Sequence, residues 1–256
     1  MEATQHNAIN VTVIDEAFYI PQLDRYKRIW LYHPRRYNDV DKRYPVIYMQ
    51  DGQNLFDDAT AFGEEWQVDE TLNSMWAQCI VVGIDNSEQR LNEYNYNDNE
   101  EHGSGEGRKY MEFIVQTLKP VIDEKFRTRP EREHTYIAGS SMGGLISLYG
   151  ALDFPETFGG AGVFSPALWI APSYINDLTA FAEKNNNLSQ RFYFYGGAKE
   201  GENMVEHIMA AVNLLKSYPN YTVDVEINPV GEHSEYHWRN HFPNYYEWLT
   251  KGSADL

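Results

Sequence analysis

The five residues Gly139-Ser140-Ser141-Met142-Gly143 fit the pattern G-x-S-x-G, with Ser141 at the centre. This pattern is typical of a sharp turn from a strand into a helix, where small neighbours leave the serine backbone strained and its Oγ exposed. The context agrees, because residues 134–138 have the composition of a strand and residues 144–149 that of a helix. A turn that only packs a helix against a strand is the alternative. We predict that Ser141 is a nucleophile for acyl transfer.

A serine nucleophile needs a base that takes its proton and a carboxylate that orients the base. Where such a serine lies at the edge of an α/β sheet, the acid follows it in the chain and the histidine comes last. The histidines downstream of Ser141 are His207, His233, His237 and His241. His233 follows a predicted strand, residues 222–227, whereas the other three fall on predicted helices. We predict that His233 is the base, because it lies at the sheet edge that also carries the serine.

The loop after the predicted strand 191–195 supplies two candidate acids, Glu200 and Glu202. Both could reach the imidazole, since Gly196 and Gly197 leave the backbone free to turn. Glu202 also suits the first turn of the following helix, where the helix dipole favours an acidic side chain. That competing role makes Glu200 the predicted acid and leaves Glu202 as the alternative.

An oxyanion that develops during acyl transfer needs two backbone N–H donors. Met142, the residue after the nucleophile, is one predicted donor. The other comes from residues 51–56, where Gly52 allows an exposed backbone amide and Gln53 is the predicted donor.

Short apolar runs alternate with longer amphipathic segments along the chain. The predicted strands are residues 10–14, 28–32, 45–49, 79–84, 134–139, 160–164, 191–195 and 222–227. The predicted helices are residues 64–75, 108–126 with Pro120 as a kink or break, 142–154, 173–184, 202–217 and about 235–249. This alternation predicts an α/β fold, a mostly parallel sheet of about eight strands with an antiparallel N-terminal edge and helices on both faces. No composition shift or linker divides the chain, so we predict one domain over residues 1–256.

The net charge of the chain limits the classes of partner that it can bind. Lysine and arginine number 21 against 38 aspartates and glutamates, which gives a formal charge of −17. A negative field repels phosphate backbones and anionic lipids, so we expect a small-molecule partner and neither nucleic acid nor membrane.

The single cysteine, Cys79, lies in an apolar run and excludes an internal disulfide framework. Residues 1–7 are polar and lack the apolar core of a signal peptide, which predicts a cytoplasmic location.

One long tract, residues 85–107, is rich in Asn, Glu and Gly and has no clear periodicity. It directly follows a predicted central strand, at the carboxyl edge where open α/β sheets bind ligands. We predict that this tract, Trp169 and the segment around Trp66 line the substrate pocket. A solvated acidic loop is the alternative.

Seven segments resemble, in the same order, the esterase D-like "putative esterase" branch of the α/β-hydrolases. They are residues 46–57, 65–70, 82–86, 139–144, 164–169, 197–200 and 231–233. This branch includes feruloyl and acetyl-xylan esterases, trilactone-siderophore hydrolases and mycolyltransferases. The resemblance extends over nearly the whole chain and implies an α/β-hydrolase fold that hydrolyses a carboxylic ester through an acyl-enzyme.

Individual residues match this branch as well. Ser141 matches its nucleophile, Glu200 its acid and His233 its base. Gln53 matches a donor of the oxyanion hole, and Arg90 resembles an arginine near the substrate cleft, with its role open. The chain lacks the cysteine-bearing segment that S-formylglutathione hydrolases carry after the third strand, which argues against that activity. Feruloyl, acetyl-sugar and siderophore-lactone esters all remain open as substrates.

Two rival functions deserve comparison. His233, His237 and His241 are spaced by four residues and could bind zinc from one helix face. The pattern H-E-x-x-H is absent, because Ser234 follows His233, so we predict no metal and no cofactor. A non-catalytic binding module of the same fold would have lost a member of the serine, acid and histidine set, and all three are present.

Overall fold

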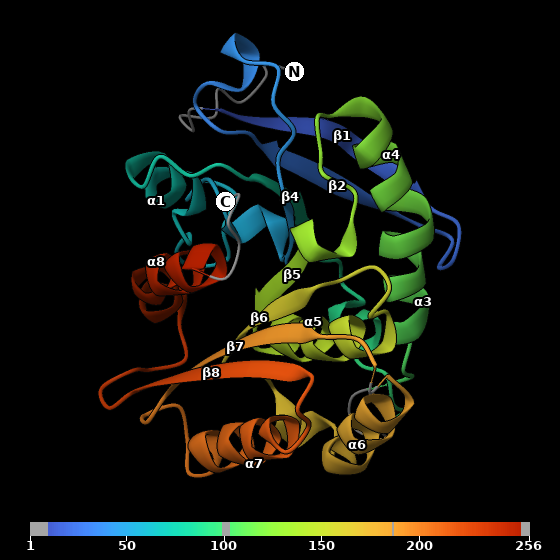
Figure 1. Ribbon diagram of the computed structural model, residues 1–256, viewed down its shortest axis with the longest axis vertical. Coiled ribbons are helices and arrows are strands. Elements are labelled where there is room, and N and C mark those ends of the chain that lie inside the picture. Colours follow the sequence, from blue (N-terminus) through green and yellow to red (C-terminus); the bar gives the residue numbers. More distant parts are fainter. Residues whose placement is uncertain (1–9, 99–102, 186, 252–256) are drawn as a thin grey trace.

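The computed structural model describes residues 10–98, 103–185 and 187–251. Its centre is an eight-stranded sheet in the order β1-β2-β4-β3-β5-β6-β7-β8 (Figure 1). The strands are β1 (Val11–Ile20), β2 (Arg25–Tyr32), β3 (Val46–Gln50), β4 (Ile80–Ile84), β5 (Thr135–Ser140), β6 (Gly160–Phe164), β7 (Gln190–Gly197) and β8 (Tyr221–Asn228). β2 runs antiparallel to both β1 and β4, and the pairs from β4 to β8 are parallel. The predicted fold class and its antiparallel N-terminal edge are confirmed.

Helices cover both faces of this sheet. They are α1 (Val68–Ser74), α2 (Arg90–Glu93), α3 (Gly107–Phe113), α4 (Lys119–Lys125), α5 (Met142–Asp153), α6 (Tyr174–Lys184), α7 (Met204–Lys216) and α8 (Glu235–Lys251). No helix in the described ranges is long and apolar enough to cross a membrane.

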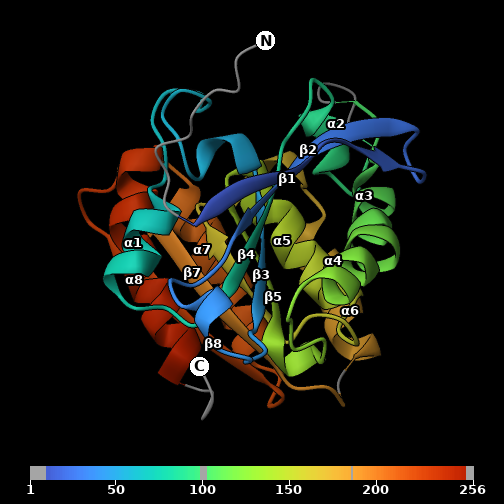
Figure 2. The same cartoon turned by 90° about the horizontal axis from the view of Figure 1, so that it is seen from above.

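Two hydrophobic cores lie on opposite faces of the sheet, because successive side chains of a strand point to opposite sides. In β3, Ile47 and Met49 belong to the core that α1 and α8 cover. Val46 and Tyr48 belong to the core that α3 to α7 cover. Figure 2 shows the sheet between these two groups of helices.

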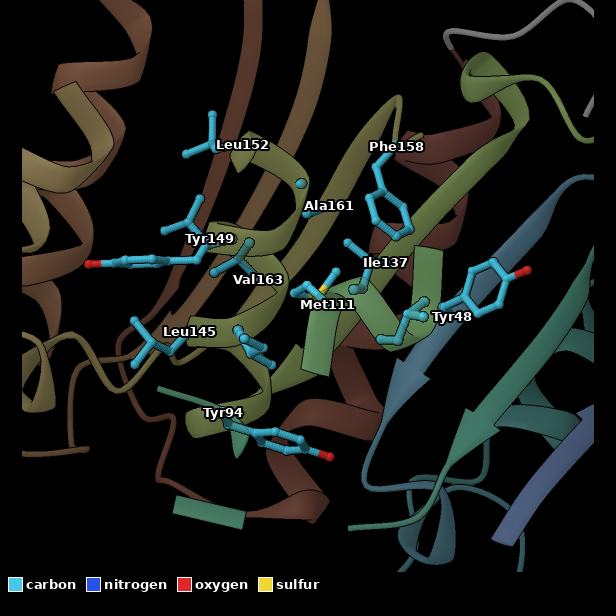
Figure 3. Packing of buried hydrophobic residues seen from close by; sticks show 14 of the residues in the cluster. Tyr48, Tyr94, Met111, Ile137, Leu145, Tyr149, Leu152, Phe158, Ala161 and Val163 are labelled. Atoms are coloured by element: carbon cyan, nitrogen blue, oxygen red, sulfur yellow. The ribbon is translucent and has the colours of Figure 1, made fainter. Parts of the chain in front are cut away.

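Helix α5 is buried along its whole length against β5 and β6. Figure 3 shows its side chains Leu145, Tyr149 and Leu152 packed among the residues of the core. A Cβ at Gly150 would come within 2.4 Å of Met111 Cε on α3, so glycine permits this close packing. The helix that follows Ser141 is therefore packed between the sheet and α3.

Three predicted segments differ from the structure. The helix expected over residues 108–126 is divided by a π-helical turn (Ile114–Leu118), and Pro120 lies in the first turn of α4, where its missing N–H is tolerated. The helix expected over residues 64–75 begins only at Val68. The tract 85–107 contains α2 and the fully buried Tyr94. Within that tract, residues 99–102 lie outside the described residues, as do residues 1–7 and the signal-peptide prediction made on them.

Candidate active site

The backbone turns sharply at Ser141, between the end of β5 and the start of α5. Its φ and ψ are 56° and −121°, a backbone conformation that residues other than glycine rarely adopt. The turn is fixed by neighbouring backbone, since Ser141 N–H donates to the Phe164 carbonyl at 2.9 Å and its own carbonyl accepts from Leu145 N–H at 3.0 Å. A Cβ at Gly139 would lie 2.7 Å from the Gly143 carbonyl oxygen, so only glycine fits there. The chain thus has the strained strand–turn–helix geometry that the motif predicts.

His233 and Glu200 meet at the carboxyl edge of the sheet, in the loops after β8 and β7. A hydrogen bond of 2.8 Å joins His233 Nδ1 and Glu200 Oε2. The Glu200 side chain is fully buried, whereas that of His233 is 31% exposed. Of the two candidate acids, the structure brings Glu200 to the histidine. Both glutamates line a smaller cavity of about 200 Å³, but the hydrogen bond to the histidine comes from Glu200.

Two further donors hold the second oxygen of this carboxylate. Glu200 Oε1 accepts hydrogen bonds from Gly197 N–H at 2.6 Å and from Ser165 Oγ at 2.7 Å. Ser165 in turn accepts a bond of 2.9 Å from Trp238 Nε1, and its φ is 43°. Sequence reasoning did not single out Ser165 or Trp238 for this role, because a lone serine after a strand carries no distinguishing pattern. These contacts fix the orientation of the carboxylate toward His233.

The turn after β3 is held by an ion pair with Arg90. Asp51, whose φ is 57°, begins the short 3₁₀ turn Gly52–Asn54. Arg90 Nε and Nη2 donate to the two carboxylate oxygens of Asp51 at 2.7 and 2.8 Å. Asn86 Nδ2 donates to the same carboxylate at 2.7 Å, and Asn86 N–H donates to Gln53 Oε1 at 3.0 Å. Asp51 and Asn86 were missed by sequence reasoning, since nothing in their spacing indicates that they meet.

A cavity of about 500 Å³ contains both Ser141 and His233. Its lining residues are Asp51, Gln53, Asn54, Phe62, Asn86, Arg90, Ser140, Ser141, His233, Glu235 and Trp238. The tract 85–107 thus contributes Asn86 and Arg90 to the wall. Met142, the other predicted oxyanion donor, is buried as the first residue of α5.

The two tryptophans predicted as pocket walls take different places. Trp66 is 3% exposed, and its ring lies 5.8 Å from that of Trp238. Among the described residues that line the cavity of Ser141 and His233, Trp238 is present and Trp66 is not, so Trp66 supports the wall from behind. Trp169 is 48% exposed and its ring lies 6.2 Å from that of His233. It lines the smaller cavity with Glu202.

The three histidines considered as zinc ligands have separate partners. His233 bonds Glu200, His237 Nδ1 bonds Ser234 Oγ at 3.1 Å, and His241 Nδ1 bonds Glu226 at 2.7 Å. Over the ranges that the structure describes, no group of three or more His, Cys, Asp or Glu side chains is arranged to hold a metal ion.

Curated proteins with similar sequences include an esterase. The chain is 30% identical over 149 residues to the uncharacterized protein YbbA of Bacillus subtilis, covering 56% of this chain and 58% of YbbA. It is 29% identical over 166 residues to the iron(III) salmochelin esterase of Escherichia coli, covering 63% of this chain and 37% of that protein. The match thus spans less than two thirds of the length of these curated relatives.

Among solved structures, the siderophore hydrolase EstB of Aspergillus nidulans superposes with a TM-score of 0.76 at 16% identity. The superposition covers 94% of this chain and 95% of EstB, which establishes a shared fold. The sequence profile of the family described as "Putative esterase" matches residues 20–249. On that match, together with the α/β-hydrolase sheet, the chain belongs to this esterase family.

Proposed function

We propose that the chain is a serine carboxylesterase that forms an acyl-enzyme on Ser141, with His233 as base and Glu200 as the acid of the triad. The observation that carries the proposal is the 2.8 Å bond between His233 Nδ1 and the buried Glu200, in a cavity that His233 shares with the strained Ser141. A carboxylate on Nδ1 fixes the tautomer in which Nε2 can accept a proton. Family membership supports the same reaction class.

In the first half-reaction His233 Nε2 takes the Ser141 proton while Oγ attacks the ester carbonyl carbon. The tetrahedral intermediate collapses when the C–O bond to the alcohol breaks, and His233 gives its proton to the leaving oxygen. In the second half-reaction His233 removes a proton from water while the water oxygen attacks the acyl carbon. The bond between the acyl carbon and Ser141 Oγ then breaks, His233 returns the proton to Oγ, and the carboxylic acid leaves. Glu200 stabilises the imidazolium in both steps.

The backbone N–H groups of Met142 and Gln53 are the proposed oxyanion donors. Removal of such a donor typically costs about a hundredfold to a thousandfold in kcat. Arg90 acts on this hole as a positioning residue. Its two-point bond to Asp51 and the Asn86 contacts to Asp51 and Gln53 hold the 3₁₀ turn that presents Gln53.

A cavity of about 500 Å³ suits a short-acyl or aryl ester. The named activities of similar proteins, a salmochelin esterase and a ferulic acid esterase, support siderophore-lactone or feruloyl esters as more specific candidates, and acetyl-sugar esters stay open. The rival of another class is a non-catalytic binding module with this fold.

The test is hydrolysis of p-nitrophenyl esters with acyl chains of two to twelve carbons, with and without a serine-directed phosphonate, followed by intact mass. We expect turnover of short chains, its loss on phosphonate treatment, and one adduct that is missing from the Ser141→Ala variant. Absence of both turnover and adduct would favour the binding module. Turnover that survives the phosphonate and stops with a chelator would favour a metal hydrolase.

A further inference from the structure

The charged groups of the catalytic cavity are unevenly paired. Arg90 is paired with Asp51 through two hydrogen bonds of 2.7 and 2.8 Å. Glu235 lines the same cavity, and no ion pair of its carboxylate occurs within the described ranges. With Arg90 balanced by Asp51, Glu235 leaves the cavity with one uncompensated negative charge.

Glu235 is fixed beside the reaction centre. It is the first residue of the 17-residue helix α8, and it follows His233 by two positions. Its side chain is half-buried, and burial together with the charge of Asp51 raises its pKa; a hydrogen bond from its own backbone N–H and the nearby His233 and Arg90 offset part of this rise. The start of a helix favours the ionised form of such a carboxylate. A partly desolvated charge interacts with a ligand more strongly than an exposed one, because water screens it less.

Two aromatic side chains also line this cavity. Phe62 and Trp238 line the same cavity, and Phe62 is 87% exposed. Aromatic faces attract ammonium groups, and the attraction grows when the cation is desolvated. The chain as a whole carries a formal charge of −17, which raises the local concentration of cations and lowers that of anions.

We propose, building on the esterase function proposed above, that the substrate is an ester bearing a positively charged ammonium group, and that Glu235 is the residue that selects it. The Glu235 carboxylate repels anionic esters. The guanidinium of Arg90 does not offset this repulsion, because it is already paired with Asp51. Glu235 takes no part in proton transfer in this scheme. Its contribution is the difference in binding between a cationic ester and a neutral one.

A purely structural role for Glu235 makes a different prediction. An acid in the first turn of α8 stabilises the helix through its dipole. Loss of that contribution would lower the free energy of unfolding and change kcat/KM for all esters by the same factor. The ratio of kcat/KM between two esters of equal shape cancels such a common effect, and it isolates the charge selection.

The matched substrates are acetylcholine and 3,3-dimethylbutyl acetate, which differ by the exchange of a quaternary nitrogen for carbon. We expect the wild-type protein to prefer acetylcholine, and the Glu235→Gln variant to lower the cationic-to-neutral ratio by about tenfold, the equivalent of about 1.4 kcal/mol. Glu232→Gln is the control, because Glu232 is an exposed acid near His233 and leaves the ratio unchanged. A ratio equal in Glu235→Gln and wild type, or a wild-type preference for the neutral ester, overturns the proposal.

A binding measurement separates this proposal from the catalytic one. Choline and 3,3-dimethylbutanol are titrated calorimetrically into Ser141→Ala and into Ser141→Ala/Glu235→Gln. We expect choline to bind more tightly than its neutral isostere, and the preference to vanish with Glu235→Gln. Choline selectivity without hydrolysis of any ester would overturn the esterase alone. Ester hydrolysis without choline selectivity would overturn the cation site alone.

Discussion

The hydroxyl of the fully buried Ser165 donates a 2.7 Å hydrogen bond to Glu200 Oε1. The same hydroxyl accepts a 2.9 Å bond from Trp238 Nε1. With Gly197 N–H on the same carboxylate oxygen and His233 on the other, Glu200 has bonds on both of its oxygens. The orientation of the acid is thus set by the β6 and β7 loops together with α8, which are far apart in the sequence.

Removal of this hydroxyl tests its orienting role. We expect Ser165→Ala to lower kcat by about tenfold with little change in KM, because one hydrogen bond of the acid is lost, worth about 1.4 kcal/mol. The buried Trp238 Nε1 also loses its acceptor, so the free energy of unfolding falls by about 1–3 kcal/mol. Steady-state kinetics and urea unfolding measure both effects. A kcat that stays at the wild-type value would argue against an orienting role.

The two glutamates after β7 form a matched pair of variants. We expect Glu200→Gln to lower kcat by on the order of a thousandfold, because an amide neither selects the correct tautomer of His233 nor stabilises the imidazolium. In Glu202→Gln the hydrogen bond between Glu200 and His233 is kept, and kcat stays within about threefold of wild type. A larger loss in Glu202→Gln would move the acid of the triad to that position.

The strained backbone of Ser141 predicts different stabilities for two inactive variants. Its φ of 56° suits glycine better than any residue with a Cβ. We expect Ser141→Gly to be about 1 kcal/mol more stable than Ser141→Ala, since it relieves the backbone strain, and both to lack hydrolysis. Thermal unfolding of the two purified variants gives the comparison. Equal stabilities would mean that the surrounding hydrogen bonds carry the turn without strain.

Arg90 provides a test of positioning through Asp51. We expect Arg90→Met to lower kcat by about tenfold to a hundredfold, less than the loss of an oxyanion donor itself, with KM changed by less than about threefold. Arg90→Lys keeps the charge but not the two-point geometry, so it recovers only part of kcat. A change confined to KM would indicate instead that Arg90 contacts the substrate.

The buried carboxyl group of Asp69, in α1, predicts how the free energy of unfolding depends on pH. Asp69 is 2% exposed, and burial, together with a side-chain hydrogen bond that its protonated form donates to Glu70, raises its pKa to about 8. The unfolded chain releases this proton near pH 4, whereas the folded chain keeps it to about pH 8, so the contribution to stability is full below pH 4 and is lost as the pH rises through that window.

We therefore expect Asp69→Asn to flatten this fall, with its largest stabilisation relative to wild type near pH 8 and the smallest near pH 4. Urea unfolding of both proteins at several pH values checks the sign. Glu88→Gln, at an exposed position, serves as the control and leaves the pH dependence unchanged. A variant whose advantage grows toward acid pH would contradict the neutral state of Asp69.

Much of the architecture follows from local patterns. The strand over residues 160–164 lies where the apolar run predicts it, and the first two strands form the expected antiparallel edge. Hydrophobic periodicity reports which face of an element is buried, and this suffices for element type and order. The predictions for the helical segment around Pro120 and for the start of α1 were wrong in detail. A π-helical turn and a late helix start depend on packing that the local pattern does not encode.

The sequence by itself determined the fold class and the strand–turn–helix motif around Ser141. These features depend on patterns of residues close together in the chain. Only the tertiary structure decided that Glu200 rather than Glu202 reaches His233, that Arg90 is paired with Asp51, and that Trp66 lies behind the cavity wall. Such choices depend on distances between side chains brought together by separate loops, and a one-residue change in a turn redirects a side chain by several ångströms.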